Sequence, residues 1–98
     1  MRLFVTGIGT EVGKTVVSAI LTEALQADYW KPVQAGDLDY SDTHKVKDMV
    51  SNSKSLFHDE TFALNHPMSP HAAAERDKVE ISLGDFKIPE TEHHLIIE

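Results

Sequence analysis

A glycine-containing loop near the start of the chain, Thr6–Thr15 (TGIGTEVGKT), restricts the possible folds more than any other stretch. The apolar run Leu3–Val5 precedes it and reads as a buried parallel strand. After the loop, residues 15–26 carry apolar side chains at helical spacing, and Tyr29–Val33 is a second strand pattern that Pro32 ends or places at an edge. Strand, loop, helix and strand form a right-handed β-α-β unit. The predicted fold class is α/β, a parallel sheet flanked by helices.

The loop ends in Gly13–Thr15, as a nucleotide-binding P-loop does, but its spacing is unusual. The pattern G-x-x-x-x-G-K-[ST] requires its first glycine at position 8, where this chain has Ile8. Counted from the glycine before Ile8 the loop is one residue too long, and counted from the glycine after it the loop is one residue too short. The flanking strand and helix favour a P-loop over a glycine-rich turn with a solvated lysine, so the sheet is predicted to be of the P-loop NTPase type.

The chemistry of such a loop explains the residue types at its end. Consecutive backbone N–H groups form a nest for an anion, and the helix that follows adds the positive end of its dipole. Lys14 adds a point charge for the β- and γ-phosphates, and the Thr15 hydroxyl lies where it can coordinate Mg²⁺.

The remaining chain continues the α/β pattern less clearly. A helix is predicted from about Asp42 to Val50, a surface loop follows, and residues 57–65 fit neither pattern well. Ser69 as N-cap and Pro70 in the first helical turn predict a short helix in SPHAAAERD. Residues 78–89 fit neither helix nor strand strongly, although Val79, Ile81 and Leu83 alternate like a strand, and Leu95–Ile97 predicts another buried strand.

Composition excludes several classes of protein. The chain has 98 residues, a formal net charge of −7 with nine Lys and Arg, and no cysteine. A nucleic-acid partner is not expected, because such proteins present a basic surface, and neither a disulfide framework nor a Cys-ligated zinc site can form. No apolar run approaches the roughly 18 residues of a membrane span, and the chain starts with no signal-peptide core. We expect one domain of a soluble, cytoplasmic protein.

Four stretches, taken together, resemble dethiobiotin synthetases. Glu11–Thr15, preceded by Val-Thr-Gly, is similar to the P-loop of that family, which has this length. Residues 29–46 (YWKPVQAGDLDYSDTHKV) resemble its K-P-V segment with a later S-D pair that opens a helix. Residues 65–75 (NHPMSPHAAAE) resemble its P-x-S-P-H stretch, and residues 94–98 (HLIIE) resemble the strand that leads into its E-G-A-G-G loop. The resemblance spans nearly the whole chain in the right order.

The resemblance implies an activity in biotin synthesis. Enzymes of this family close a cyclic urea on 7,8-diaminononanoate, using CO₂, ATP and Mg²⁺. One amine of the substrate takes up CO₂ as a carbamate, ATP phosphorylates the carbamate, and the second amine displaces phosphate. Since a carbamate and a γ-phosphate are both anions, the site must supply cations and hold the reactants in line. A homodimer of the full-length protein is implied as well.

The resemblance also assigns site residues. Lys14 is expected to hold the phosphates, Thr15, Asp42 and Glu98 to bind Mg²⁺, and Lys31 to act as the catalytic lysine that neutralises the carbamate and the transferring phosphoryl group. The expected nucleotide- and metal-binding positions are Glu11, Val12, Gly13, Lys14, Thr15, Val16, Asp42 and Glu98. The expected substrate-binding positions are Thr10, Glu11, Lys31 and Ala35.

One of these positions departs from the family pattern, and others have structural alternatives. Many members have Ser or Thr where this chain has Ala35, which weakens that contact. Asp42 fits a helix N-cap equally well, Glu98 fits a surface carboxylate at a strand end, and Lys31 on spacing alone fits a solvated lysine. His71 fits a role near the substrate or subunit interface, or on the surface at a helix start.

Two further functions stay open, and the end of the chain adds an expectation. A cobyrinate-type amidotransferase shares this P-loop fold, and a nucleotide-binding module without catalysis would also fit the loop. A buried strand that ends at Glu98 lacks a following helix, so residues 1–98 are expected to be the N-terminal part of a single P-loop ATP-binding synthetase domain, inactive alone.

Overall fold

The computed structural model describes residues 1–7 and 12–98, and within them two parallel sheets carry the candidate functional residues. The larger sheet has the strand order β1-β6-β2-β4, and the smaller one pairs β3 with β5. The strands are β1 Arg2–Phe4, β2 Asp28–Trp30, β3 Val33–Ala35, β4 Phe57–His58, β5 Phe62–Leu64 and β6 Leu95–Ile97. The α-helices are α1 Val12–Leu25, α2 Asp42–Met49 and α3 Pro70–Arg76, and two short 3-10 helices are η1 Leu38–Tyr40 and η2 Leu83–Asp85.

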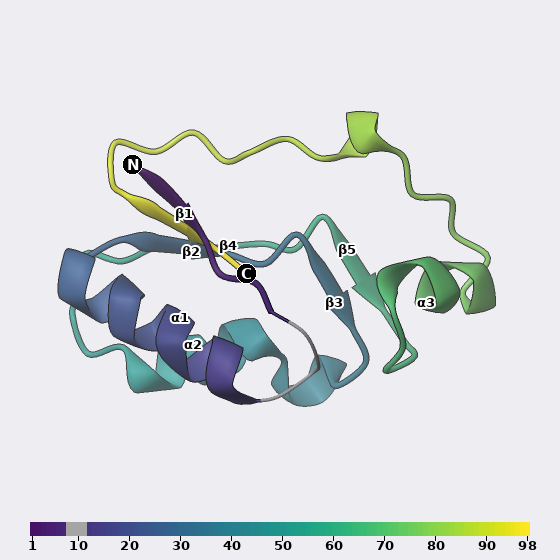
Figure 1. Cartoon of the computed structure of the whole chain (residues 1–98), viewed down its shortest axis with the longest axis horizontal. Helices are drawn as coiled ribbons and strands as arrows, with labels where there is room; N and C mark the ends of the chain where they lie inside the picture. Colours follow the sequence, from purple (N-terminus) through teal and green to yellow (C-terminus); the bar gives the residue numbers. More distant parts are fainter. Residues whose placement is uncertain (8–11) are drawn as a thin grey trace.

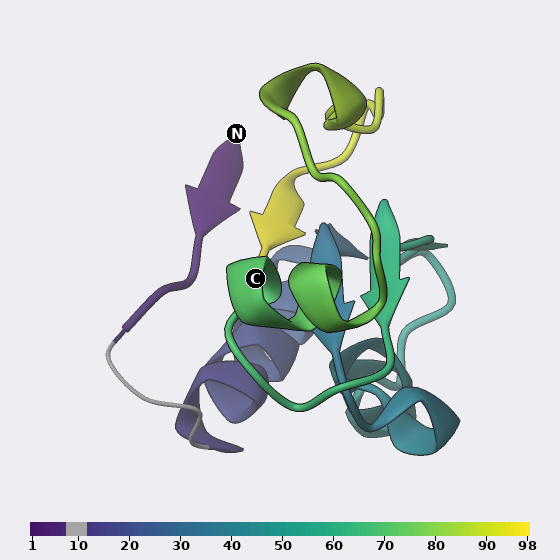
Figure 2. The ribbon, with the colours of Figure 1, turned by 90° about the vertical axis from the view of Figure 1, so that its right-hand side faces the viewer.

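The helices divide between the two sheets. Helices α1 and α2 lie side by side on one face of the larger sheet, whereas the connection from α3 to β6 runs along the other side (Figure 1). Helix α3 covers the smaller sheet, as Figure 2 shows from the side, and its Ala73 and Ala74 are buried with Leu64 of β5. The predicted α/β class, with a parallel sheet flanked by helices, is confirmed.

The register of the larger sheet places three strand ends at the same level. Phe4 of β1 lies opposite Ile97 of β6, and Ile97 lies opposite Trp30 of β2. Because the three strands are parallel, the residues that follow them emerge at one edge of the sheet. Glu98 and Lys31 are therefore neighbours in space, although β6 enters the sheet between two strands that precede it in the chain.

The core fixes which way the strand residues point. Tyr29 and Ile96, which are paired in register, are fully buried with Ala19 of α1 and Val46 of α2. Side chains alternate between the faces of a strand, so Lys31 and Glu98, two residues further along, point to the same helix-covered face.

Each helix starts and ends for a local reason. Helix α1 ends at Leu25, because the next residue, Gln26, has a left-handed backbone with φ 48°, and the Ala27 N–H donates to the Thr22 carbonyl at 3.0 Å. Helix α2 begins with a capping box, in which the Ser41 hydroxyl accepts from the His44 N–H and the Ser41 N–H donates to His44 Nδ1.

Several sequence predictions need correction. Helix α1 begins at Val12, three residues earlier than predicted. The predicted strand Tyr29–Val33 is two strands, because Pro32 separates β2 from β3 and the two join different sheets. Strand β1 is only half-buried, since it has one neighbour and Phe4 is 68% exposed. The alternation in residues 78–89 forms no strand, and Leu83 is 91% exposed there.

Candidate active site

A cavity of about 590 Å³ opens at the edge of the sheet where β1, β6 and β2 end. It lies between the start of α1, the start of α2 and the segment before α3, so elements distant in sequence supply its walls. The lining residues are Lys14, Thr15, Lys31, Val33, Gln34, Ala35, Asp37, Asp42, Lys45, Pro67, Met68, Ser69, Pro70 and Glu98.

Glu98 is at the centre of the polar contacts. Its side chain is 3% exposed, and two hydroxyl groups donate to its carboxylate. Thr15 Oγ1 donates to Oε2 at 3.1 Å, and the Tyr29 phenol donates to Oε1 at 2.7 Å. Burial, followed by the negative charge of Glu98, raises the pKa of Tyr29 far above its ordinary value, so the phenol keeps its proton. The alternative that Glu98 is a surface carboxylate is therefore wrong.

Lys31 lies between two of the acidic residues that line the cavity, Asp42 and Glu98. Its Nζ lies 2.5 Å from Asp42 Oδ2 and 3.9 Å from Glu98 Oε2. The Lys31 side chain is 17% exposed, which excludes a freely solvated lysine. A second ammonium, Lys45 Nζ, lies 3.9 Å from Asp42 Oδ1. Asp42 therefore lies between the two ammonium groups, and Lys31 lies between the two carboxylates of Asp42 and Glu98.

The position of Asp42 excludes one of its two predicted roles, the N-cap of α2. Ser41, not Asp42, is the N-cap of α2, and Asp42 is the first residue of the helix. Gln34, buried in β3, accepts a hydrogen bond from the Asp42 N–H at 3.2 Å and donates to the Gly36 carbonyl at 3.0 Å. The Asp42 carboxylate is therefore available to Lys31, and the N-cap alternative is wrong.

The wall opposite Lys31 depends on a close backbone contact. Gly36 has φ +77°, and a Cβ atom built on it would lie 2.7 Å from the Cα and Cβ of Pro67. This contact brings the segment before α3, with Ser69 and Pro70, against the end of β3. The P-x-S-P-H stretch thus lines the same cavity as the K-P-V segment.

The structure brings together six of the predicted site residues in this cavity. Lys14, Thr15, Lys31, Ala35, Asp42 and Glu98 all line the cavity, and Lys14 Nζ donates to the Gly7 carbonyl at 3.3 Å. Gly13 and Val16 belong to the first turns of α1 beside Lys14 and Thr15 but do not line it, and the backbone of Val12 begins that helix. Thr10 and Glu11 lie outside the described residues. His71, in α3, does not line the cavity.

Sequence analysis missed three residues of this site. The sequence placed Tyr29 in a strand but did not predict its hydrogen bond to Glu98. It gave no reason to select Gln34 or Lys45. The hydroxyl of a buried tyrosine usually finds a partner, which was the available signal for Tyr29. Gln34 and Lys45 become recognisable only when β3 and α2 are placed side by side.

A second polar cluster occupies the opposite end of the sheet. Asp28, with no exposed side-chain surface, lies 2.9 Å from His58 Nε2 through Oδ2 and 2.8 Å from His93 Nδ1 through Oδ1. Burial by itself raises the pKa of Asp28, but hydrogen bonds from His93, Thr91, His58 and the Leu56 N–H outweigh it and lower the pKa to about 2. This carboxylate links β2 to the segments before β4 and β6 and does not contact the cavity.

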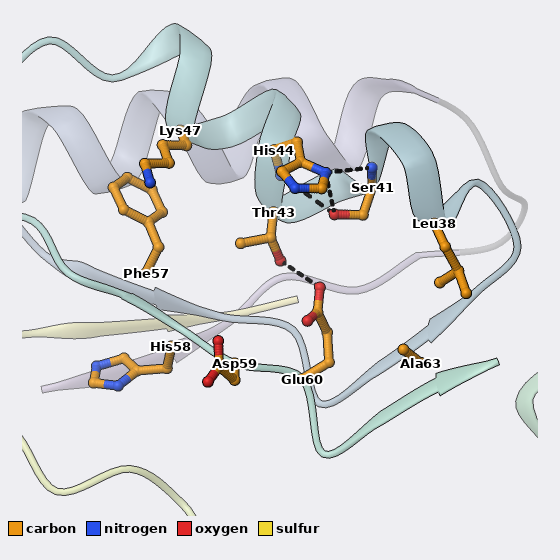
Figure 3. A pocket seen from close by; sticks show the side chains of 10 residues that line it. All are labelled: Leu38, Ser41, Thr43, His44, Lys47, Phe57, His58, Asp59, Glu60 and Ala63. Atoms are coloured by element: carbon orange, nitrogen blue, oxygen red, sulfur yellow. Dashed lines mark hydrogen bonds between the residues drawn. The ribbon is translucent and has the colours of Figure 1, made fainter.

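A smaller cavity of about 280 Å³ lies between α2 and the strands β4 and β5 (Figure 3). The Thr43 hydroxyl points across it and donates to Glu60 at 3.1 Å, and His44 turns toward Ser41 (Figure 3). Four of its polar side chains thus pair with one another, Thr43 with Glu60 and Ser41 with His44, whereas in the larger cavity Thr15, Lys31 and Asp42 are linked through contacts with Glu98 and with each other. The larger cavity is the candidate active site.

Among the described residues, no group of three or more His, Asp or Glu side chains could hold a metal ion. No helix in this part of the chain combines the length and apolar character needed to cross a bilayer. A metal at this site would need ligands beyond carboxylates and imidazoles.

The fold and the site together define an α/β protein of the P-loop NTPase type. Helix α1 follows the first strand, its first turn contains Gly13, Lys14 and Thr15, and Lys14 and Thr15 line the cavity from there.

Residues 1–98 match the family described as AAA domain, and the chain belongs to that family. It is similar to the ATP-dependent dethiobiotin synthetase BioD of Christiangramia forsetii, with 65% identity over 97% of this chain and 46% of the relative. The proteins of the same name from Cytophaga hutchinsonii and Chlamydia felis are 50% and 48% identical over 99% and 100% of this chain, and over 47% and 46% of their own lengths.

The chain therefore spans about half the length of the curated relatives it matches. No solved structure matches it. The resemblance inferred from the four stretches is confirmed.

Proposed function

We propose that this chain carries the phosphate-binding and catalytic lysines of an ATP-dependent dethiobiotin synthetase. The activity would close the cyclic urea of dethiobiotin from 7,8-diaminononanoate and CO₂ through a phosphorylated carbamate. The observation that carries the proposal is the convergence of Lys14, Thr15, Lys31, Asp42 and Glu98 in one cavity, from positions up to 84 residues apart in the chain. The similarity to proteins of that name along nearly all of this chain supports it.

The donor set fits Mg²⁺. Thr15 Oγ1 and Glu98 Oε2 are 3.1 Å apart, and the ammonium of Lys31 contacts both Glu98 and Asp42, so a cationic group already finds favourable surroundings between the two carboxylates. Hydroxyl and carboxylate oxygens are hard ligands, and Mg²⁺ uses one or two protein carboxylates together with the phosphates of its nucleotide. Thr15 and the two carboxylates would hold the ion, which when bound supplies positive charge to the β- and γ-phosphates.

The lysines would do the electrostatic work of phosphoryl transfer. A carbamate oxygen attacks the γ-phosphorus, the bond from that phosphorus to the ADP oxygen breaks, and negative charge is redistributed among the oxygens. Lys14, at the start of α1, would hold the β- and γ-phosphates together with the helix N-terminus. An ammonium has three N–H donors, and two from Lys31 can face Asp42 and Glu98, which leaves one to hold the carbamate.

The second half of the reaction needs a neutral amine. That amine attacks the carbonyl carbon of the phosphorylated carbamate, inorganic phosphate leaves, and the amine proton is released as the ring closes. Ala35 has no hydroxyl, so its side chain would contact the substrate only by van der Waals packing and would not hydrogen-bond to it.

The test is phosphate release by the intact protein with ATP, Mg²⁺, bicarbonate and diaminononanoate. Release that depends on diaminononanoate, with dethiobiotin as product, is expected. Dependence on glutamine would instead indicate the amidotransferase, and release that depends on neither substrate would contradict the proposal.

A matched pair of variants tests whether the cavity is responsible for the phosphate release. Lys14→Ala should slow substrate-dependent phosphate release about 100-fold or more, because one preorganised charge on the phosphates is lost. Lys54→Ala removes an exposed lysine outside the cavity and should leave the rate close to that of the wild type.

We further propose a homodimer of the intact protein, cytoplasmic in location, as the family resemblance implies. Sedimentation analysis of the purified protein tests the dimer.

A further inference from the structure

The carboxylate of Glu98 is oriented by hydroxyl groups on both of its oxygens. Oε2 accepts from Thr15 and faces Lys31, whereas Oε1 accepts from Tyr29 at 2.7 Å. Oε2 thus points to the groups that line the cavity, and Oε1 points to the protein interior. A carboxylate held at one oxygen can still rotate about that contact, but one held at both oxygens has a fixed orientation.

Tyr29 is more deeply buried than Thr15, the other hydroxyl donor to Glu98. It has no exposed surface and belongs to the core of Ala19, Val46 and Ile96. Its ring also packs against Phe57 of β4, with 6.3 Å between ring centroids. Since Tyr29 lies in register with Ile96, two residues before Glu98 on the neighbouring strand, the phenol follows the strand axis toward the cavity edge.

We propose that Tyr29 is a positioning residue of this site: its phenol holds the Glu98 carboxylate so that Oε2 faces Thr15 and the place where a divalent cation binds with the nucleotide. This rests on the proposed function in so far as that function uses such a cation. Tyr29 does not reach the cavity itself, because it is not among the lining residues. Its effect is transmitted through Glu98, in the way that outer partners of metal ligands control affinity.

The contact also accounts for the direction of the Thr15 hydroxyl. A hydroxyl that offers a lone pair to a cation must give its proton to another acceptor. Because Tyr29 holds Oε1 on the interior side, Oε2 is the oxygen that faces Thr15 and accepts its proton. Tyr29 therefore positions two of the three proposed cation-binding side chains.

The chain offers a closely matched control. Tyr40, the other tyrosine of the chain, donates its hydroxyl to the Asp48 carboxylate at the same 2.7 Å. Tyr40 is 50% exposed, and neither Tyr40 nor Asp48 lines the active-site cavity. Tyr29→Phe and Tyr40→Phe thus delete the same group from the same kind of contact.

The experiment measures Mn²⁺ binding to the intact protein in the presence of a non-hydrolysable ATP analogue, by electron paramagnetic resonance. Tyr29→Phe should weaken Mn²⁺ binding about 10-fold or more, and Tyr40→Phe should leave it within about 2-fold of the wild type. In a Glu98→Gln background the further change Tyr29→Phe should alter Mn²⁺ affinity less than about 2-fold, because the residue through which Tyr29 acts is already changed.

Three results would overturn the proposal. The first is wild-type Mn²⁺ affinity in Tyr29→Phe, and the second is an equal loss in both backgrounds. The third is loss of folding in Tyr29→Phe while Tyr40→Phe stays folded, which would assign the hydroxyl to stability. The readout is independent of turnover, so a wild-type protein that binds Mn²⁺ and the analogue but forms no dethiobiotin would contradict the proposed function and not the role of Tyr29.

Discussion

The buried carboxylate of Asp28 makes a quantitative prediction about stability. Replacement of Asp28 by Asn keeps the shape of the side chain and removes its charge at the end of β2 opposite the candidate active site. An Asn oxygen can still accept from the Leu56 N–H, but its NH₂ group faces one of the two histidines, which must then change tautomer to accept. The variant should therefore fold but be less stable.

The size of the loss follows from the pKa of Asp28. Its ordinary value is 3.8, and hydrogen bonds in the folded protein lower it to about 2. This difference corresponds to about 2.5 kcal/mol of folding free energy once the group is ionised in both states. Because the folded pKa is the lower one, the stabilisation is complete above about pH 5 and is lost as the pH falls through 2. About half of it should remain at pH 3.

The assay is urea unfolding of the intact wild-type protein and of Asp28→Asn at pH 7 and pH 3. The two proteins should differ by about 2.5 kcal/mol at pH 7 and by about half of that at pH 3. Asp59→Asn, a change of an exposed carboxylate next to His58, is the control and should differ from the wild type by less than about 0.5 kcal/mol. A loss in Asp28→Asn that is equal at both pH values would refute the reasoning, since it would not come from the charge.

The other predictions concern the cavity. Lys31→Gln should lower kcat about 100-fold or more while ATP binding changes little, because its charge acts mainly in the transition state; unchanged kinetics would contradict its role. Asp42→Asn should raise the Mg²⁺ concentration for half-maximal rate about 10-fold, and since Ser41 already caps α2, an unshifted Mg²⁺ titration would remove Asp42 from the metal site. Gly36→Ala should lower the unfolding free energy by about 2–4 kcal/mol, because it combines a positive φ with a Cβ that overlaps Pro67. Wild-type stability in that variant would contradict this reasoning, because it would show that Pro67 can move away from residue 36 at little cost.

Local features of this chain could be predicted from its sequence because their causes are local. The apolar spacing after Gly-Lys-Thr predicted helix α1, although the helix begins three residues earlier, and Ser69 followed by Pro70 predicted the start of α3. Leu95–Ile97 was predicted with its correct bounds because an uninterrupted apolar triplet is the pattern of a strand buried on both faces. Asp42 stayed ambiguous, since Ser and Asp are both good caps and adjacent in the chain.

Tertiary structure decided which of these local elements meet. Leu95–Ile97 enters the sheet between β1 and β2, and only this pairing brings Glu98 to Thr15, 83 residues away in the chain. Residues 78–89 alternate like a strand, yet they form none, because a strand requires a hydrogen-bonded neighbour as well as a pattern. Likewise Tyr29 became part of the site through its register with β6, which its own apolar surroundings do not reveal. Helix starts and loops depend on nearby residues, whereas strand order depends on which distant segments bury each other, and the site is built at the ends of the strands.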